Sequence, residues 1–173
     1  MKRGNRRLVL VAHNLRSAHN VGSLLRTADG LGLVSVYLTG YTPYPETTGD
    51  ERPPHIRRKV SAAISKTALG AENKLNWRHA NDIHKCLDEL VNDGYRIVAL
   101  EQTAKADSIE DFKAAGDIAL VVGNEVGGLE EDVLKTIDTH LLIPMLGTKE
   151  SFNASIAAAM ALYHLRYLDK PTA

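Results

Sequence analysis

Short runs of apolar residues alternate along the chain with longer amphipathic segments, and this alternation constrains the fold more than any other feature. Runs of this length, rich in β-branched residues, are typical of strands buried on both faces of a parallel sheet. The segments between them have the spacing of helices that cover such a sheet. We therefore predict an α/β fold with a mostly parallel sheet flanked by helices. The predicted strands are Leu8–Ala12, Ser35–Gly40, Arg96–Leu100, Ile118–Val122 and Leu141–Met145, the last closed by Pro144.

Three segments carry apolar residues at helical spacing. The first covers residues 21–31, and Asn20 before it is a suitable N-cap. The second predicted helix is Ala80–Asn92, and Gly94 supplies its stop. The third, about Asn153–Tyr167, is rich in alanine. These helices fall between or after the predicted strands, as the α/β pattern requires.

The length of 173 residues suits one domain, which we expect to span residues 1–173. A single cysteine, Cys86, excludes an intramolecular disulfide framework and suits a reducing compartment. The apolar stretch after the basic start of the chain, Leu8–Ala12, is too short for the core of a signal peptide, and no run approaches membrane-spanning length. We expect a cytoplasmic protein. Residues 41–59 hold four of the six prolines and are predicted to be irregular.

The charges are distributed unevenly although the net charge is zero. Residues 1–70 hold eleven Lys or Arg against four Asp or Glu, a balance of +7, and the remainder holds ten against seventeen, a balance of −7. A basic half is consistent with a surface that binds nucleic-acid phosphates. The alternative is that the two halves interleave in the fold and their charges mix on the surface.

Several chemistries are disfavoured by the sequence. The glycine-rich stretch at 123–129 has no Lys-Ser/Thr pair of a phosphate loop and does not match the dinucleotide fingerprint. The seven histidines, among them His13 and His19, have no metal-ligand spacing, so we expect no metal. Ser151 lacks the Gly-x-Ser-x-Gly context of a hydrolase nucleophile. Ligands of parallel α/β sheets bind at the carboxyl ends of the strands, which places a site at the loops 101–102, 123–128 and 145–153.

Three segments, 14–28, 118–129 and 143–159, together resemble the three signature motifs of the SpoU (TrmH-like) family of RNA ribose methyltransferases, within the SPOUT superfamily. Their order matches, and the resemblance extends over essentially the whole chain. It departs from the common pattern at Val126-Gly127-Gly128 and at Phe152, which replaces a leucine. The resemblance implies an α/β domain with a C-terminal trefoil knot, S-adenosylmethionine as cofactor and a homodimer.

The resemblance also implies roles for individual residues. It makes Arg26 the catalytic residue, which we interpret as an electrostatic and orienting group because arginine stays protonated. Each residue has a simpler alternative: Asn20 as a helix cap, Arg26 as a surface residue, Glu125 as a carboxylate at the helix start after Leu129, and Ser151 or Asn153 as an N-cap. The implied catalytic set is Arg26, Asn20, Glu125, Ser151 and Asn153, and the implied cofactor-binding set is Leu100, Gly123, Ile143, Met145, Ser151 and Asn153.

The reaction that this resemblance implies is methyl transfer from S-adenosylmethionine to a ribose 2′-hydroxyl of a structured RNA. The compact length favours tRNA, with rRNA as the alternative substrate. A non-catalytic RNA-binding module is a further alternative, and a nucleotide-binding or receiver-like domain is disfavoured because 11–14 lacks acidic residues. The alanine face of the last helix suits either a dimer interface or packing within one subunit. Candidate RNA contacts are Arg6, Arg7, Arg16, Arg57, Arg58 and Lys59.

Overall fold

The computed structural model describes residues 6–113 and 115–168 and contains one sheet in which every neighbouring pair of strands is parallel. The strand order is β3-β2-β1-β6-β4-β7-β5, so β1 and β6 lie at the centre. The mostly parallel α/β sheet predicted from the alternating pattern is confirmed. Its strands are β1 (Leu8–His13), β2 (Ser35–Thr39), β3 (Trp77–Ala80), β4 (Tyr95–Leu100), β5 (Asp107–Ser108), β6 (Asp117–Val122) and β7 (Thr139–Leu142).

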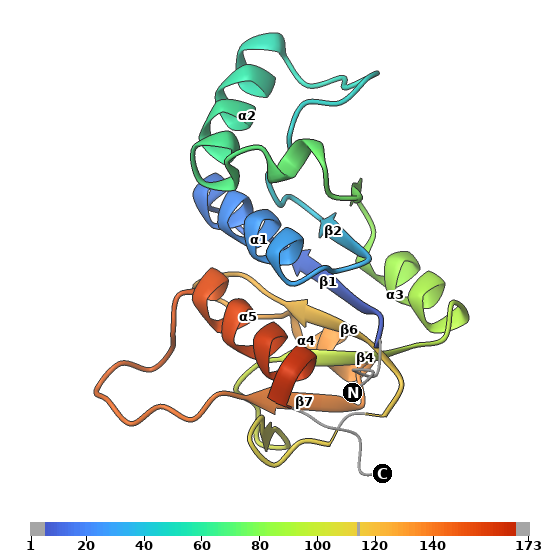
Figure 1. Ribbon diagram of the computed structural model, residues 1–173, viewed down its shortest axis with the longest axis vertical. Helices are drawn as coiled ribbons and strands as arrows, with labels where there is room; N and C mark the ends of the chain where they lie inside the picture. The colour runs from blue at the N-terminus through green and yellow to red at the C-terminus, as the bar shows by residue number, and fades with distance from the viewer. Residues whose placement is uncertain (1–5, 114, 169–173) are drawn as a thin grey trace.

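Helices cover both faces of the sheet (Figure 1). On one face α1 lies beside α5, and α2 packs against α1 at the outer end of the molecule. On the other face α3 packs against β4. The helical elements are α1 (Ala18–Gly30), α2 (Pro54–Ala68), the 3-10 turn η1 (Ala71–Asn73), α3 (Ile83–Asn92), α4 (Glu131–Lys135), α5 (Ala154–Tyr163) and the π-helical turn η2 (His164–Leu168).

The strand residues alternate between two hydrophobic cores, one on each face of the sheet. Leu8, Leu10 and Ala12 of β1 pack with α1, α2 and α5, whereas Val9 and Val11 pack with α3 and α4. Because β1 is buried on both sides, its sequence is a continuous apolar run rather than an alternating one. No helix within the described residues has the length and apolar character needed to cross a membrane.

The structure differs from the predicted elements in several places. Residues 54–59 of the segment predicted to be irregular begin α2, with Pro54 at the helix start where a missing N–H costs nothing. The strand β3 was not predicted, because its Arg78 and His79 break the apolar pattern. Ser17, not Asn20, caps α1, since its side chain accepts a hydrogen bond from the backbone N–H of Asn20. Asp82 caps α3, which therefore begins later than predicted.

Two further differences lie near the carboxyl edge of the sheet. The last long strand, β7, ends at Leu142, before the residues Ile143–Met145 that were predicted to continue it. The chain from 143 to 153 instead forms a loop that projects from the body of the molecule (Figure 1). The predicted basic start of the chain and the end of the predicted domain, residues 1–5 and 169–173, lie outside the described residues.

Candidate functional site

A cavity of about 350 Å³ opens at the carboxyl ends of β4, β6 and β7. The three strand-end loops predicted to form a site all contribute to its wall, and α5 closes one side. Parallel strands place their carboxyl ends at one edge, so loops far apart in sequence meet there. The lining residues include Leu100, Glu101, Gln102, Gly123, Asn124, Glu125, Val126, Gly128, Ile143, Glu150, Ser151, Phe152 and Ala157.

Backbone packing at Gly123 shapes this cavity. A Cβ built on Gly123 would lie 2.5 Å from the carbonyl carbon of Gly128 and 2.6 Å from the backbone nitrogen of Leu129. The loop is closed by backbone hydrogen bonds in both directions between Asn124 and Gly128. A side chain at Gly123 would collide with this backbone, so glycine is the residue that allows the loop to fold back on itself at the cavity wall.

Two side chains that were not in the predicted site set hold the loops together. The Glu101 carboxylate accepts hydrogen bonds from the backbone N–H of Leu129 at 2.9 Å and of Gln102 at 3.1 Å. The Gln102 side chain donates to the backbone carbonyl of Glu150 at 2.8 Å. Their position directly after a buried strand, in one of the three predicted loops, is the sequence signal that identifies them.

Asn20, Glu125 and Asn153, three of the predicted catalytic residues, meet beside the cavity. The Asn20 side chain donates to Glu125 Oε1 at 2.9 Å, and Asn153 Nδ2 donates to Asn20 Oδ1 at 3.2 Å. Asn153 also caps α5 by accepting hydrogen bonds from Ser155 and Ile156. These bonds connect the start of α1, the loop after β6 and the start of α5, so capping and site assembly coexist at Asn153.

The Glu125 carboxylate binds the start of α1. The alternative interpretation from the sequence, in which Glu125 stabilises the start of the helix after Leu129, is therefore wrong. The carboxylate accepts hydrogen bonds from the backbone N–H groups of Arg16 at 3.0 Å and Ser17 at 3.3 Å. Burial raises the pKa of Glu125, but the hydrogen bonds from Arg16 and Asn20 outweigh this effect and bring the pKa below its ordinary value. Glu125 is therefore an ionised anchor between the loop and α1.

The predicted cofactor-binding residues divide into two groups. Leu100, Gly123, Ile143 and Ser151 line the cavity. Met145 and Asn153 are not part of its wall: Met145 lies half-buried in the projecting loop, and Asn153 faces Asn20.

Arg26 lies outside this cluster. Six residues are about one and two-thirds turns of an α-helix, so Arg26 does not share the face of α1 that carries Asn20. Its side chain is exposed and does not line the cavity. Within residues 6–113 and 115–168, no side chain forms an ion pair with its guanidinium. The Arg26 side chain therefore lies on the surface of the subunit and not in the cavity of the same subunit.

The six basic residues proposed as RNA contacts also separate into two groups. Arg6 and Arg7 lie at the opposite edge of the sheet, before β1, where Arg6 donates to the Gly116 carbonyl and Arg7 pairs with Asp117 at 2.7 Å. Arg57 pairs with Glu46 at 3.2 Å. These three arginines therefore have partners within the chain, and their assignment as RNA contacts stays a prediction. Arg16, Arg58 and Lys59 are exposed.

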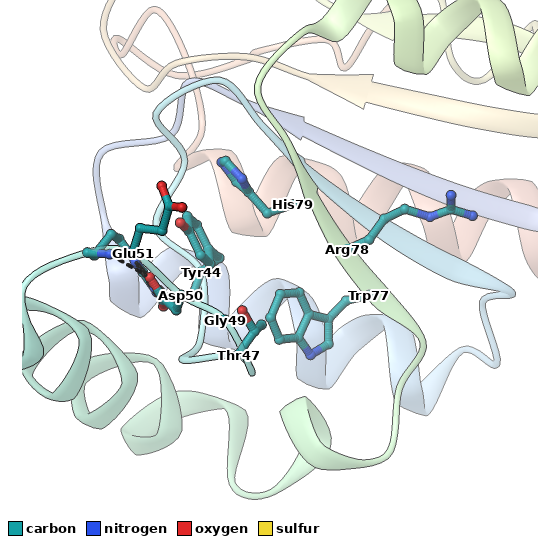
Figure 2. Close-up of a pocket in the computed structure, with 9 residues that line it drawn as sticks. Tyr44, Thr47, Gly49, Asp50, Glu51, Trp77, Arg78 and His79 are labelled. Atoms are coloured by element: carbon teal, nitrogen blue, oxygen red, sulfur yellow. Dashed lines mark hydrogen bonds and ion pairs between the residues drawn. The ribbon is translucent and has the colours of Figure 1, made fainter.

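A separate hollow, of about 720 Å³ and away from this cavity, lies between the loop after β2 and the strand β3 (Figure 2). Four of its lining residues, Tyr44, Asp50, Arg52 and His79, contact one another. The Arg52 guanidinium lies 3.5 Å from the centre of the Tyr44 ring and pairs with Asp50, and the other neighbour of Tyr44 is the stacked ring of His79 at 4.0 Å. The hydrogen bond from Arg52 holds the pKa of Asp50 well below its usual range. This cluster fixes the loop, and none of the predicted site residues belongs to it.

No three His, Cys, Asp or Glu side chains of the described residues come together as a set that could hold a metal ion. The cavity is instead formed by backbone groups, apolar side chains and a few polar ones. A parallel sheet whose strand-end loops enclose such a cavity defines an α/β protein that binds a compact organic ligand at the carboxyl edge.

The chain belongs to the SpoU rRNA Methylase family, whose model matches residues 7–163, and the predicted family is thereby confirmed. A Staphylococcus epidermidis protein assigned to the TrmH family of tRNA/rRNA methyltransferases is 29% identical over 157 residues, which are 91% of this chain. This chain spans only 57% of the length of that relative.

Solved structures share the fold. The SpoU methyltransferase AviRb from Streptomyces viridochromogenes, in complex with the cofactor AdoMet, superposes with a TM-score of 0.74 at 23% identity, over 91% of this chain and 56% of that one. A protein described in connection with the 2-OH methylation of C/U34 on tRNA superposes with a TM-score of 0.73 at 24% identity, over 96% of this chain and 97% of that one. The cofactor predicted from the sequence, S-adenosylmethionine, is the one bound in AviRb.

Proposed function

We propose that this protein transfers a methyl group from S-adenosylmethionine to a ribose 2′-hydroxyl of a structured RNA, and that this RNA is a tRNA. The observation that carries the proposal is the cavity in which the strand-end loops of a SpoU-family chain converge around a glycine that admits no side chain. The neighbour of nearly the same length, described for 2-OH methylation of C/U34 on tRNA, favours tRNA over rRNA. A single domain over 1–173 and a cytoplasmic location belong to the same proposal.

The residues of this chain fit the cofactor. Leu100 and Ile143 offer apolar contacts for the adenine, and Gly123 lets the loop after β6 pack closely on itself in the cavity wall. When bound, S-adenosylmethionine supplies an activated methyl group. The Asn20–Glu125–Asn153 connection holds two of the cavity loops against α1, so the protein contributes position rather than a covalent step. The trefoil knot implied by the family falls in this C-terminal half of the chain.

Arg26 is proposed to act on the ribose of the RNA in the cavity of a partner subunit. Its exposed position on α1, away from its own cavity, supports this assignment. The partner would pack on α5, which lies beside α1. The alanine face of α5 is used within the subunit, because Ala158 and Ala161 are fully buried. The exposed stripe Ile156, Met160 and Tyr163 is therefore the face that we assign to the homodimer interface.

The decisive experiment measures single-turnover methyl transfer to unmodified total tRNA, with ribose methylation mapped by mass spectrometry. Arg26→Ala is expected to lower the rate by about 10²–10³-fold without weakening cofactor binding, because it removes charge stabilisation in the transition state. Arg26→Lys keeps the charge but loses the planar fork and should be nearly as inactive. Arg78→Ala, which removes an exposed arginine of β3, is the control.

Mixed dimers test the assignment across subunits. Arg26→Ala is combined with Ala157→Phe, a variant whose added ring fills the cavity. If Arg26 acts on the partner's cavity, the mixture recovers activity, because one intact cavity meets one intact Arg26. If the mixture of the two inactive variants remains inactive, this arrangement across subunits is contradicted. The proposed substrate is contradicted if the wild-type protein methylates rRNA but not tRNA, or methylates neither of them.

A further inference from the structure

A second hollow, of about 460 Å³, adjoins the cofactor cavity on the other side of the loop after β6. Asn124, Val126 and Gly128 line both spaces, so the loop is a shared wall between them. Arg16, Tyr41, Gly127 and Glu130 complete the lining of this second hollow. The inference drawn from this hollow rests on the proposed function. If the ribose of an RNA strand reaches the cofactor cavity, the neighbouring nucleotides of that strand must lie close to this wall.

Tyr41 gives the hollow an exposed aromatic face. It lies in the turn that follows β2, and 62% of its surface is exposed. The ring is held in place at two points: its hydroxyl lies 2.7 Å from Asn124 Nδ2, and its backbone N–H donates to Asn14 Oδ1 at 3.0 Å. An aromatic ring that is both exposed and fixed loses little entropy when a base stacks on it.

Asn124 connects this ring to the cofactor loop. Its Oδ1 accepts hydrogen bonds from the backbone N–H groups of Val126 at 2.8 Å and Gly127 at 3.0 Å, while its Nδ2 donates to the Asn14 carbonyl and approaches the Tyr41 hydroxyl. The position of the Tyr41 ring is therefore tied to the loop that forms the wall of the cofactor cavity.

The charges of the hollow suit a nucleotide. Arg16 is exposed, and among the residues that the structure describes none forms an ion pair with its guanidinium. The one carboxylate, Glu130, is engaged by Asn14 Nδ2 at 2.6 Å and by His13 Nε2 at 3.1 Å. His13 is buried at the end of β1.

We propose that Tyr41 and Arg16 form a binding site for the nucleotide next to the methylated one, with its base stacked on the Tyr41 ring and its phosphate bound by Arg16. Recognition of an unstacked base by an aromatic face, and of the backbone by an arginine, is the chemistry of single-stranded RNA binding. This site accepts any base, because stacking uses the ring face and not the base edges.

The test measures binding of two fluorescently labelled probes, a single-stranded RNA of mixed sequence and an abasic RNA of the same length and charge. Tyr41→Ala is expected to weaken binding of the RNA about tenfold and to leave binding of the abasic probe unchanged, because only the stacking is lost. Tyr41→Phe keeps the ring but loses the hydroxyl contact with Asn124, so it should bind RNA more weakly than the wild type and more strongly than Tyr41→Ala. Arg16→Ala should weaken binding of both probes and reduce their salt dependence by about one phosphate contact.

Calorimetric titration with S-adenosylmethionine separates this proposal from the proposed function. Cofactor binding by Tyr41→Ala shows that the variant is folded, and Arg78→Ala is the charge-matched control for Arg16→Ala. If wild-type protein binds RNA and Tyr41→Ala binds it equally well, the nucleotide site is wrong while the methyltransferase assignment stands. A change of oligomeric state in Tyr41→Ala, with RNA binding unchanged, would assign the hollow to a protein interface and overturn the proposal. If wild type binds the cofactor but neither probe, the nucleotide site is wrong, whereas the methyltransferase proposal is decided separately by methyl transfer to tRNA.

Discussion

At the residue scale, two glycines of one loop differ sharply in what they tolerate. A Cβ at Gly123 would meet backbone atoms of Gly128 and Leu129 that have no freedom to move, whereas nothing lies within 4 Å of a Cβ at Gly127. We expect Gly123→Ala to lower the free energy of unfolding by about 1–3 kcal/mol, the usual cost of overpacking, and to weaken cofactor binding. Gly127→Ala, the matched control, should change stability by less than about 0.5 kcal/mol. Urea unfolding and cofactor titration of both variants provide the measurement, and equal behaviour would contradict this account of the loop.

Glu125 supplies a pH-dependent part of the stability. Because its folded pKa lies below the ordinary value of 4.5, its contribution is present above about pH 4.5 and is lost as the pH falls through the folded pKa. Glu125→Gln should therefore lower the free energy of unfolding by about 1 kcal/mol at neutral pH, since hydrogen bonds to a charged group are stronger. The difference from wild type should shrink in acid. A difference that stays constant down to about pH 3 would show that the charge is not responsible. Glu131→Gln, in an exposed pair with Lys135, is the control.

At the scale of the elements, α5 has two apolar faces and its own subunit covers only one. Ala158, Ala161 and Leu162 are fully buried, whereas Ile156 and Met160 remain 53% and 36% exposed. We expect Met160→Asp to convert a dimer of about twice 18.9 kDa into a monomer, because a charge placed in a closed two-fold interface occurs twice. Sedimentation at micromolar concentration measures the mass. Val91→Asp, at an exposed apolar position of α3, is the control. A Met160→Asp variant that remains dimeric would assign the interface elsewhere.

At the scale of the whole molecule, a ligand that binds only the folded chain stabilises all of it. With S-adenosylmethionine at about one hundred times its Kd, the stability should rise by about 2.7 kcal/mol, and Tm by about 5–10 °C. We expect this shift to be unchanged by EDTA, because the described side chains of the cavity form no set of three metal ligands. Thermal unfolding with cofactor, with cofactor and EDTA, and with EDTA alone measures it. A shift that EDTA removes would show that a metal takes part in binding.

The strands of the sheet centre could be predicted because their residues are buried on both faces. Leu8–Ala12 and Ile118–Val122 read as continuous apolar runs, and the structure places both within adjacent central strands. The edge strand β3 carries polar residues on its exposed side and gave no such signal. The helix α2 begins within a proline-rich segment, and only two of its residues, Ile64 and Ala68, are buried, because it packs mainly on α1 rather than on the sheet.

The sequence by itself determined the parallel α/β class, the family and the three loops that converge at the cavity, because these follow from local patterns of apolar and glycine residues. Only the tertiary structure decided how the side chains of these loops are used. Asn20 caps no helix and joins Glu125 to Asn153, and Arg6 and Arg7 pair at the far edge of the sheet. Each of these contacts joins residues more than a hundred positions apart. Their geometry depends on where parallel strands end in space, which no local pattern encodes.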